Sequence, residues 1–294
     1  MTAPTWHILG AGAMGCLFAS RLQLTKCPVE LILRDGFSSK STTVTVEQAD
    51  KKTEFSVAAS TPGDDNYISH LLITTKAQDI AASTRSIRHR LNANSQILVL
   101  SNGLGYAQEL AAILPGSTCF FGATTEGAYR LSARHIRYAG RGITRVGHIQ
   151  SSSPPDWFTH WSAALNSSWS HTIEKVLWHK FAINCAINPL TAVYGCVNGE
   201  LAAPGKWSMV QKLCQEIAAL SALEGKTDAI GDLEEEVKEV VLATANNRSS
   251  MLQDVLAGRP TEIQYLTGHI LQRAEHHRVE LPTNRALFER LQHL

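Results

Sequence analysis

The sequence predicts an α/β protein, with an N-terminal Rossmann-type doubly wound sheet and a C-terminal all-helical domain. Short apolar strands alternate with helical or turn-rich segments over the first part of the chain, beginning with a strand, a glycine-rich loop and a helix. From about Glu174 onward the apolar spacing is almost wholly helical. A chain of 294 residues, 44% of them hydrophobic, can build two such cores. We expect the domains to be residues 1–172 and 173–294.

The first elements are an apolar run at residues 6–9, which predicts a strand, and residues 16–24, whose spacing predicts a helix. A G-x-G-x-x-G motif joins them. In dinucleotide-binding folds its glycines permit a tight turn, let the backbone approach a pyrophosphate and allow the helix to pack on the strand. Amides at the helix N-terminus then face the anion. The candidate cofactor loop is therefore Gly10, Ala11, Gly12, Ala13, Met14 and Gly15. The alternative is a glycine-rich turn without a ligand.

The second expected strand, residues 29–33, ends at Arg34, about 20 residues beyond the glycine loop. An NAD enzyme usually places Asp or Glu there, where the carboxylate binds the ribose hydroxyls. A guanidinium suits a 2′-phosphate instead, so Arg34 favours NADP over NAD. Asp35 leaves an acidic group within reach, and a plain surface arginine is the other alternative.

Further strands are expected at residues 43–46, 55–58, 71–75 and 97–100. Ligands of doubly wound sheets bind beyond the carboxyl ends of the strands. Lys76 and Asn102 each follow one of these runs closely, so both are candidates to line the cofactor crevice. The Asn-Gly-Leu-Gly sequence that begins at Asn102 is also an ordinary turn signal.

The rest of the first domain is less regular. Residues 121–128 are mostly small and predict a backbone that passes close to a ligand. Strands are expected near residues 136–138 and 145–147, followed by a helix at 156–166. A short segment around residues 171–173 closes this domain.

The second domain begins with an informative pattern, because Lys180, Asn184 and Asn188 recur every four residues. On a helix they form one polar stripe. Apolar residues surround the stripe, so an amine and two amides face a sheltered place, where unpaired polar groups are costly. A ligand with a carboxylate and a keto oxygen would satisfy all three. A solvated stripe on an outer helix is the alternative.

Composition excludes several other classes of protein. The net charge of +1 and the lack of a concentrated basic face argue against nucleic-acid binding. The six cysteines form no C-x-x-C pair, which indicates neither a metal site nor a disulfide framework. No apolar run approaches the roughly 20 residues of a membrane helix, and the start of the chain does not read as a cleavable signal. We expect a reduced, cytoplasmic protein with no bound metal and no membrane partner.

Several separated motifs occur in the order typical of ketopantoate reductases, the 2-dehydropantoate 2-reductases. They are G-A-G-A-M-G from Gly10, T-T-K-A around Lys76, S-N-G-L-G around Asn102, W-H-K-F-A-I-N-C-A-I-N-P-L-T-A around Lys180, N-G-E-L from Asn198 and S-S-M-L-Q-D from Ser249, with Glu262 beyond. Over essentially its whole length, the chain resembles the bacterial members of this family. The resemblance implies NADPH-dependent reduction of ketopantoate to (R)-pantoate, a step of pantothenate and coenzyme A biosynthesis.

The resemblance also implies roles for individual residues. Lys180 matches the catalytic lysine, the proton donor to the carbonyl oxygen as hydride arrives at C2. Asn102 matches a residue shared by cofactor and substrate, and Ala128 and Glu262 match cofactor-contacting positions. The implied substrate-binding positions are Asn184, Asn188, Asn198 and Ser250. The implied partners are NADPH and a small-molecule 2-keto acid, and the chain is expected to be a monomer or a homodimer.

Alternatives remain open at this stage. Glu262 follows Pro260 and Thr261, as at a helix start, so its carboxylate could cap a helix without any ligand. Related 2-keto acid reductases share the architecture and many of the motifs. A non-catalytic NADP-binding regulator would keep the glycine loop and Arg34 but not an inward Lys180. A structural protein that dimerises through its helical domain would not bind NADPH tightly.

Overall fold

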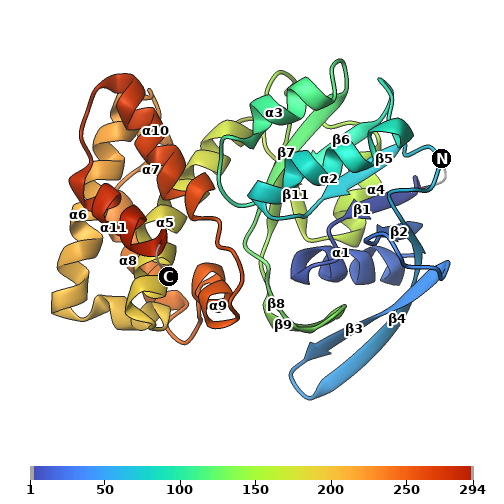
Figure 1. Ribbon diagram of the computed structural model, residues 1–294, viewed down its shortest axis with the longest axis horizontal. Coiled ribbons are helices and arrows are strands. Elements are labelled where there is room, and N and C mark those ends of the chain that lie inside the picture. The colour runs from blue at the N-terminus through green and yellow to red at the C-terminus, as the bar shows by residue number, and fades with distance from the viewer. Residues whose placement is uncertain (1–2, 293–294) are drawn as a thin grey trace. The chain divides into compact units, whose positions relative to one another are not determined.

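The computed structural model describes residues 3–292, so the outermost residues of both expected domains, 1–2 and 293–294, lie outside the described part. The chain divides into two compact units (Figure 1). The first holds the residues up to Ser101 together with Tyr106–Ile173. The second holds Asn102–Gly105 and the residues from Glu174 onward. The short segment 102–105 therefore packs with the helical unit, although it follows a strand of the first unit.

The first unit contains one sheet, with strands in the order β11-β10-β7-β6-β5-β1-β2-β4-β3-β9-β8. Strands β7, β6, β5, β1, β2 and β4 are parallel neighbours, whereas β10 and β3 pair antiparallel with β7 and β4. The strands are β1 (Trp6–Leu9), β2 (Val29–Ile32), β3 (Ser41–Gln48), β4 (Lys51–Ser60), β5 (His70–Ile73), β6 (Gln96–Val99), β7 (Thr118–Thr124), β8 (Gly127–Ser132), β9 (His135–Gly140), β10 (Thr144–Gly147) and β11 (Ser167–Trp169).

The central strands are buried because helices cover both faces of the sheet. From β1, the chain adds β2 on one side of the sheet, and later adds β5, β6 and β7 in turn on the other side. Right-handed crossovers then put α1 on one face and α2 and α3 on the opposite face. These strands are accordingly short and largely buried, with apolar residues at most positions. The helices are α1 (Ala13–Leu24), η1 (Ala77–Asp79), α2 (Ile80–Ser86), η2 (Arg88–Arg90), α3 (Tyr106–Ile113) and α4 (Trp157–Ala164).

The predicted fold class is confirmed, with differences in detail. Most of the small residues at 121–128 belong to β7 and β8, which were not predicted as strands, and β11 was not expected. Glycine and alanine interrupt the apolar pattern of β7 because its neighbours lie very close. A Cβ built on Gly122 would come within 2.4 Å of Cδ2 of Leu100. A strand shaped by such contacts has no alternating pattern to reveal it.

The hairpin of β8 and β9 is tied to α1 by a buried ion pair. Arg21 donates two hydrogen bonds to the Glu126 carboxylate, at 2.9 and 3.3 Å. The Tyr138 hydroxyl donates to the same carboxylate at 2.7 Å, and the Arg21 guanidinium lies 4.9 Å from the centre of the Tyr138 ring. The Glu126 side chain is only 2% exposed. Each of the carboxylate's two oxygens therefore depends on Arg21 or Tyr138 for its solvation.

The second unit is a helical bundle around one apolar core. No helix among residues 3–292 combines the length and apolar character needed to cross a membrane. Its first helix, α5, carries the polar stripe on one side, while Phe181, Cys185 and Ala186 are buried in the core. The elements are α5 (Ile173–Tyr194), η3 (Asn198–Ala202), α6 (Pro204–Leu223), α7 (Thr227–Ile230), α8 (Leu233–Ala243), α9 (Ser250–Leu256), η4 (Ile263–Tyr265), α10 (Thr267–His277) and α11 (Pro282–Gln292).

We predict that Arg21→Ala destabilises the protein by about 3 kcal/mol, because it leaves the Glu126 carboxylate buried without its cation. The measurement is the free energy of unfolding in urea. Arg137→Ala is the matched control, because Arg137 also pairs with a glutamate, Glu47, but is exposed. That variant should unfold at nearly the wild-type midpoint. Equal midpoints for both variants would show that the Arg21 pair does not hold the hairpin.

Candidate functional site

The glycine loop has the geometry that the sequence predicts. Gly10 lies at φ +113°, and a Cβ built there would come within 2.7 Å of the Thr75 backbone nitrogen. A Cβ on Gly15 would come within 2.0 Å of the Gly10 carbonyl oxygen. A Cβ on Gly12, at the N-cap of α1, would meet nothing within 4 Å. The close approaches therefore surround Gly10 and Gly15, whereas space is open beside Gly12.

This arrangement fits a dinucleotide pyrophosphate. The amides of the first turn of α1, including those of Ala13 and Met14, have no partner earlier in the helix and can donate to an anion. The Thr74 hydroxyl donates to the Gly10 carbonyl oxygen at 2.8 Å and so fixes the turn at the start of the loop. Ala11, the remaining loop residue, accepts a 3.6 Å hydrogen bond from the Cys16 thiol at its carbonyl oxygen.

The other predicted cofactor residues of the first unit follow different strands. Arg34 is exposed in the turn after β2, and Lys76 is the N-cap residue of η1 after β5. Ala128 lies on β8, where it is partly buried against the core beside α1. Both Arg34 and Lys76 thus follow the carboxyl ends of parallel strands, the side on which such sheets bind ligands.

In the second unit, Lys180 and Asn102 are in direct contact. The Lys180 ammonium donates a hydrogen bond to Oδ1 of Asn102 at 2.8 Å. An ammonium has three N–H donors. Among residues 3–292, the Lys180 ammonium donates one hydrogen bond, to Asn102. Two N–H bonds therefore remain for a ligand. The contact joins two positions that lie 78 residues apart in the sequence.

The ammonium also has a lowered pKa. Burial lowers the pKa of Lys180 from 10.5 to about 8, and the nearby Glu262 carboxylate opposes part of this change. The charged form is disfavoured because a buried ammonium loses water. At neutral pH the group is still mostly protonated, and it loses its proton more readily than an ordinary lysine. Such tuning is typical of a group that donates a proton in catalysis.

The loop that carries Asn102 is held by close backbone contacts. The Leu104 amide donates to the Tyr265 carbonyl oxygen at 3.0 Å. Gly103 lies at φ +78°, and a Cβ there would come within 2.6 Å of the same oxygen. Gly105 lies at φ +98°, and its Cβ would come within 3.0 Å of Nδ1 of His269. Only glycine allows both approaches, so the two glycines of this segment do more than make a turn.

The other two residues of the stripe, Asn184 and Asn188, follow Lys180 along α5. Asn184 is half-buried and Asn188 is 8% exposed. Neither amide side chain has a hydrogen-bond partner among residues 3–292. Successive stripe residues are separated by about 6 Å along the helix axis, so the amides extend from Lys180 at intervals that suit a small multifunctional ligand.

Asn198 lies at the start of η3, and Ser250 lies at the start of α9. The Asn198 amide group donates to the Thr244 hydroxyl at 2.9 Å, and its backbone amide donates to the Asn247 carbonyl oxygen at 2.9 Å. Oδ1 of Asn198 is buried without a partner in the described chain. Ser250 begins α9 and is exposed.

The N-cap of α9 fixes that helix against α5. The Ser249 hydroxyl accepts a hydrogen bond from the Leu252 amide, and the Thr191 hydroxyl lies 2.6 Å from the Ser249 hydroxyl. Thr191 also donates to the Asn188 carbonyl oxygen at 2.8 Å. This chain of contacts places the start of α9 beside the last turn of the polar stripe.

The capping role considered for Glu262 is not observed. Glu262 is the N-cap residue of η4, but its side chain makes no capping hydrogen bond. The residue is 9% exposed, and its carboxylate is close enough to affect the pKa of Lys180. A buried carboxylate near a buried ammonium is an element of a polar site rather than of a helix start.

Sequence reasoning missed three residues that shape the site: Thr74, Tyr265 and His269. Thr74 contacts Gly10. Tyr265 lies against Gly103, and His269 lies against Gly105. The glycines were visible in the sequence as signals of close approach. Their partners could not be found, because Tyr265 and His269 are distant in the chain and carry no motif of their own.

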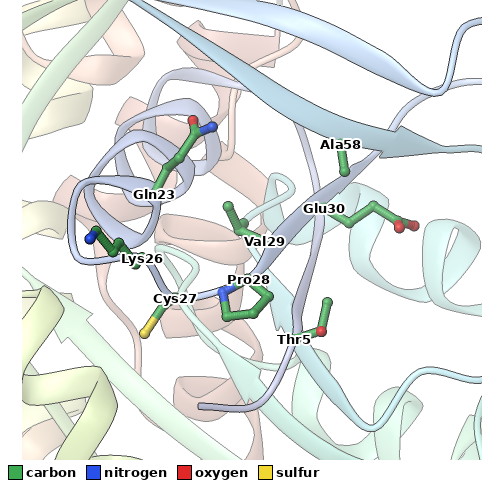
Figure 2. A pocket seen from close by; sticks show the side chains of 8 residues that line it. All are labelled: Thr5, Gln23, Lys26, Cys27, Pro28, Val29, Glu30 and Ala58. Atoms are coloured by element: carbon green, nitrogen blue, oxygen red, sulfur yellow. The ribbon is translucent and has the colours of Figure 1, made fainter. Parts of the chain in front are cut away.

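One surface cavity of about 360 Å³ lies elsewhere in the first unit (Figure 2). None of the predicted site residues lines this cavity. Its lining includes Thr5 and Pro28, the residues that immediately precede β1 and β2. It thus lies at the amino ends of parallel strands, opposite the usual ligand side. In Figure 2 the Lys26 and Glu30 side chains extend in opposite directions rather than toward a common ligand.

Among residues 3–292, no group of three or more His, Cys, Asp or Glu side chains could hold a metal ion.

Comparison with known proteins identifies the family of the chain. The family profile described as "Ketopantoate reductase PanE/ApbA" matches residues 6–151, and "Ketopantoate reductase PanE/ApbA C terminal" matches residues 172–294. A 2-dehydropantoate 2-reductase of Vibrio cholerae serotype O1 is 33% identical over 295 aligned residues, which cover 98% of this chain and 96% of that protein.

Solved structures show the same fold. A PanE/ApbA family ketopantoate reductase from Ralstonia eutropha JMP134 has a TM-score of 0.86 at 23% identity, covering 97% of this chain and 96% of that one. A D-mandelate dehydrogenase, solved with NADH and anilino(oxo)acetate, has a TM-score of 0.85 at 21% identity, covering 98% and 97%. The family profiles and the identity over nearly the whole chain lead to one conclusion: the chain belongs to the ketopantoate reductase family and is an oxidoreductase.

Proposed function

We propose that this protein catalyses the NADPH-dependent reduction of 2-dehydropantoate (ketopantoate) to (R)-pantoate, a step of pantothenate and coenzyme A biosynthesis. The observation that carries the proposal is the Lys180 ammonium, with its pKa of about 8 and its 2.8 Å hydrogen bond to Asn102. The name of the Vibrio cholerae relative, 2-dehydropantoate 2-reductase, supports this choice of substrate.

In this proposal Lys180 is the proton donor. Negative charge develops on the keto oxygen during reduction, and an ammonium in a dehydrated place stabilises it and then supplies a proton. When bound, the nicotinamide cofactor supplies the hydride. Asn102 orients the Lys180 ammonium through one of its N–H bonds, which leaves the other two to reach the oxygen.

The amide stripe would bind the rest of the substrate. The side chains of Asn184 and Asn188 have no hydrogen-bond partner in the described chain. The buried Oδ1 of Asn198 also accepts no hydrogen bond there. Amides and the Ser250 hydroxyl can hold a carboxylate and a terminal hydroxyl together, since they both donate and accept. Residues 173–294 thus form the proposed substrate-binding domain, to which the structure adds the loop that carries Asn102.

Residues 1–172 form the proposed NADP-binding domain. Gly10, Gly12 and Gly15 provide the open loop at the N-terminus of α1 for the pyrophosphate. The proposed positions for other parts of the cofactor are Arg34, Lys76, Asn102, Ala128 and Glu262. Arg34 stands where a carboxylate would favour NAD, and this supports NADPH as the preferred form.

A second candidate is the reduction of another small 2-keto acid. The fold neighbour D-mandelate dehydrogenase was solved with NADH and anilino(oxo)acetate, which shows that this architecture also serves another substrate and the unphosphorylated cofactor. A non-catalytic NADP-binding regulator is less favoured, because it would have no use for a buried ammonium with unused donors.

The test is oxidation of NADPH by the purified protein, followed by its absorbance, with a panel of 2-keto acids that includes ketopantoate. We expect turnover with ketopantoate to exceed that with the other acids at least tenfold in kcat/KM, and NADPH to be preferred over NADH. Preference for a different keto acid would establish the second candidate. Tight NADPH binding without turnover of any keto acid would contradict an enzymatic role.

The pKa of Lys180 predicts the pH dependence. The protonated ammonium is the active form, so kcat/KM for the keto acid should be constant at low pH and fall as pH rises through about 8. Lys180→Ala should lose at least about tenfold in kcat, as expected for a general acid, and should lose this fall with pH as well. An unchanged pH profile in the variant would assign the titration to another group and remove Lys180 from this role.

A further inference from the structure

One aromatic ring of the second unit contacts both elements that carry the Lys180–Asn102 hydrogen bond. The ring belongs to His269, on α10. Its centre lies 5.7 Å from that of the Phe181 ring, edge to face at 79°, and Phe181 directly follows Lys180 on α5. A Cβ built on Gly105 would come within 3.0 Å of Nδ1 of the same histidine. His269 therefore lies against α5 and against the loop that carries Asn102.

The loop is held at two successive residues by the segment that contains His269. The Leu104 amide donates a hydrogen bond to the carbonyl oxygen of Tyr265, four residues before His269. The next loop residue, Gly105, packs on the imidazole itself. Loss of the ring would leave a space under Gly105 into which the loop could relax. The contact thus bears on where Asn102, three residues earlier, is placed.

Ion pairs further along α10 fix the direction of His269. Arg273 and His277 follow it at intervals of four residues, so the three side chains lie along one side of the helix. Glu224, whose side chain is 11% exposed, accepts two hydrogen bonds from Arg273, at 2.8 and 3.0 Å, and lies 2.7 Å from Nε2 of His277. A bidentate pair restrains the geometry of both partners. Rotation of α10 about its axis would break these contacts, so the imidazole stays directed toward Gly105.

The imidazole of His269 is neutral at neutral pH. Burial lowers its pKa, the charge of Arg273 lowers the pKa further, and Glu224 opposes part of this change. A neutral ring packs against Phe181 and against glycine backbone without the water that an imidazolium requires. The contact with the loop is therefore one of shape, which another flat ring of similar size could also make.

We infer that His269 is a positioning residue for the reaction, because its ring keeps Asn102 in hydrogen-bonding contact with Lys180. The inference rests on the proposed function, in which Lys180 donates the proton. His269 acts through the loop and needs no contact with substrate or cofactor. If the loop moves away, water replaces the Asn102 oxygen and the Lys180 ammonium becomes hydrated. Burial is the main cause of the low pKa of Lys180, so hydration should raise this pKa and misplace the proton donor as well.

The test compares His269→Ala, which removes the ring, with His269→Phe, which keeps a flat ring of similar size. His277→Ala is the matched control, since it removes a histidine from the same side of α10 that contacts Glu224 instead of the loop. Kinetics with NADPH and ketopantoate give kcat and the pH at which kcat/KM falls. NMR of the lysine side chains gives the pKa of Lys180 without turnover, with its signal assigned by its loss in Lys180→Ala. Thermal unfolding checks that every variant is folded.

We expect His269→Ala to lower kcat at least about fivefold, because a small misplacement of a reacting group is costly. The pKa of Lys180, and with it the pH at which kcat/KM falls, should rise by about half a unit or more. His269→Phe should return both quantities to near their wild-type values. His277→Ala should change neither.

An unchanged pKa of Lys180 in His269→Ala would overturn the inference, even if that variant were less stable, because a purely structural role would give that result. Equal losses in His269→Ala and His269→Phe would overturn it too, since the ring's shape would then not suffice. A wild-type protein that does not reduce ketopantoate would contradict the proposed function instead, and the pKa of Lys180 in the variants would still test the loop contact.

Discussion

The structure of the candidate site depends on one hydrogen bond, from the Lys180 ammonium to Oδ1 of Asn102. Lys180 lies on α5, whose opposite side is buried in the helical core, and Asn102 lies on a loop that leaves β6. A buried ammonium is costly unless it is partnered, and a neutral amide partners it without fixing its proton as a carboxylate would. The pKa of about 8 reflects this balance between burial and the Glu262 carboxylate.

The loop contacts follow from the same constraint. For Asn102 to meet Lys180, residues 102–105 must pack with the helical unit, and they do so through backbone approaches that Gly103 and Gly105 permit. A side chain at either position would push the loop away from Tyr265 or His269. A motif that is commonly read as a simple turn therefore has a positional role, which is to place one amide oxygen.

Much of the fold could be predicted because its signals are local. The parallel strands appear as short apolar runs, and the glycine loop appears between a strand and a helix. Strands β7 and β8 were missed because close packing, as at Gly122, replaces large apolar residues with small ones. Residues 102–105 join the second unit through long-range contacts, which no local signal in the sequence reveals.

The candidate site was predictable to a similar degree. The spacing of Lys180, Asn184 and Asn188 predicted the stripe, and the place of Asn102 after a strand made it a candidate. Family resemblance supplied Asn198, Ser250, Ala128 and Glu262. The distance between Lys180 and Asn102 could not follow from spacing, because the pair spans two elements 78 residues apart.

The most direct test of this account is a double-mutant cycle between Asn102→Ala and Lys180→Ala, with kcat for ketopantoate reduction as the readout. If Asn102 acts by orienting the Lys180 ammonium, its replacement should cost little once Lys180 is gone, and the coupling free energy should reach about 1 kcal/mol or more. Additive losses in the double variant would mean that the two residues act separately and would contradict the central claim.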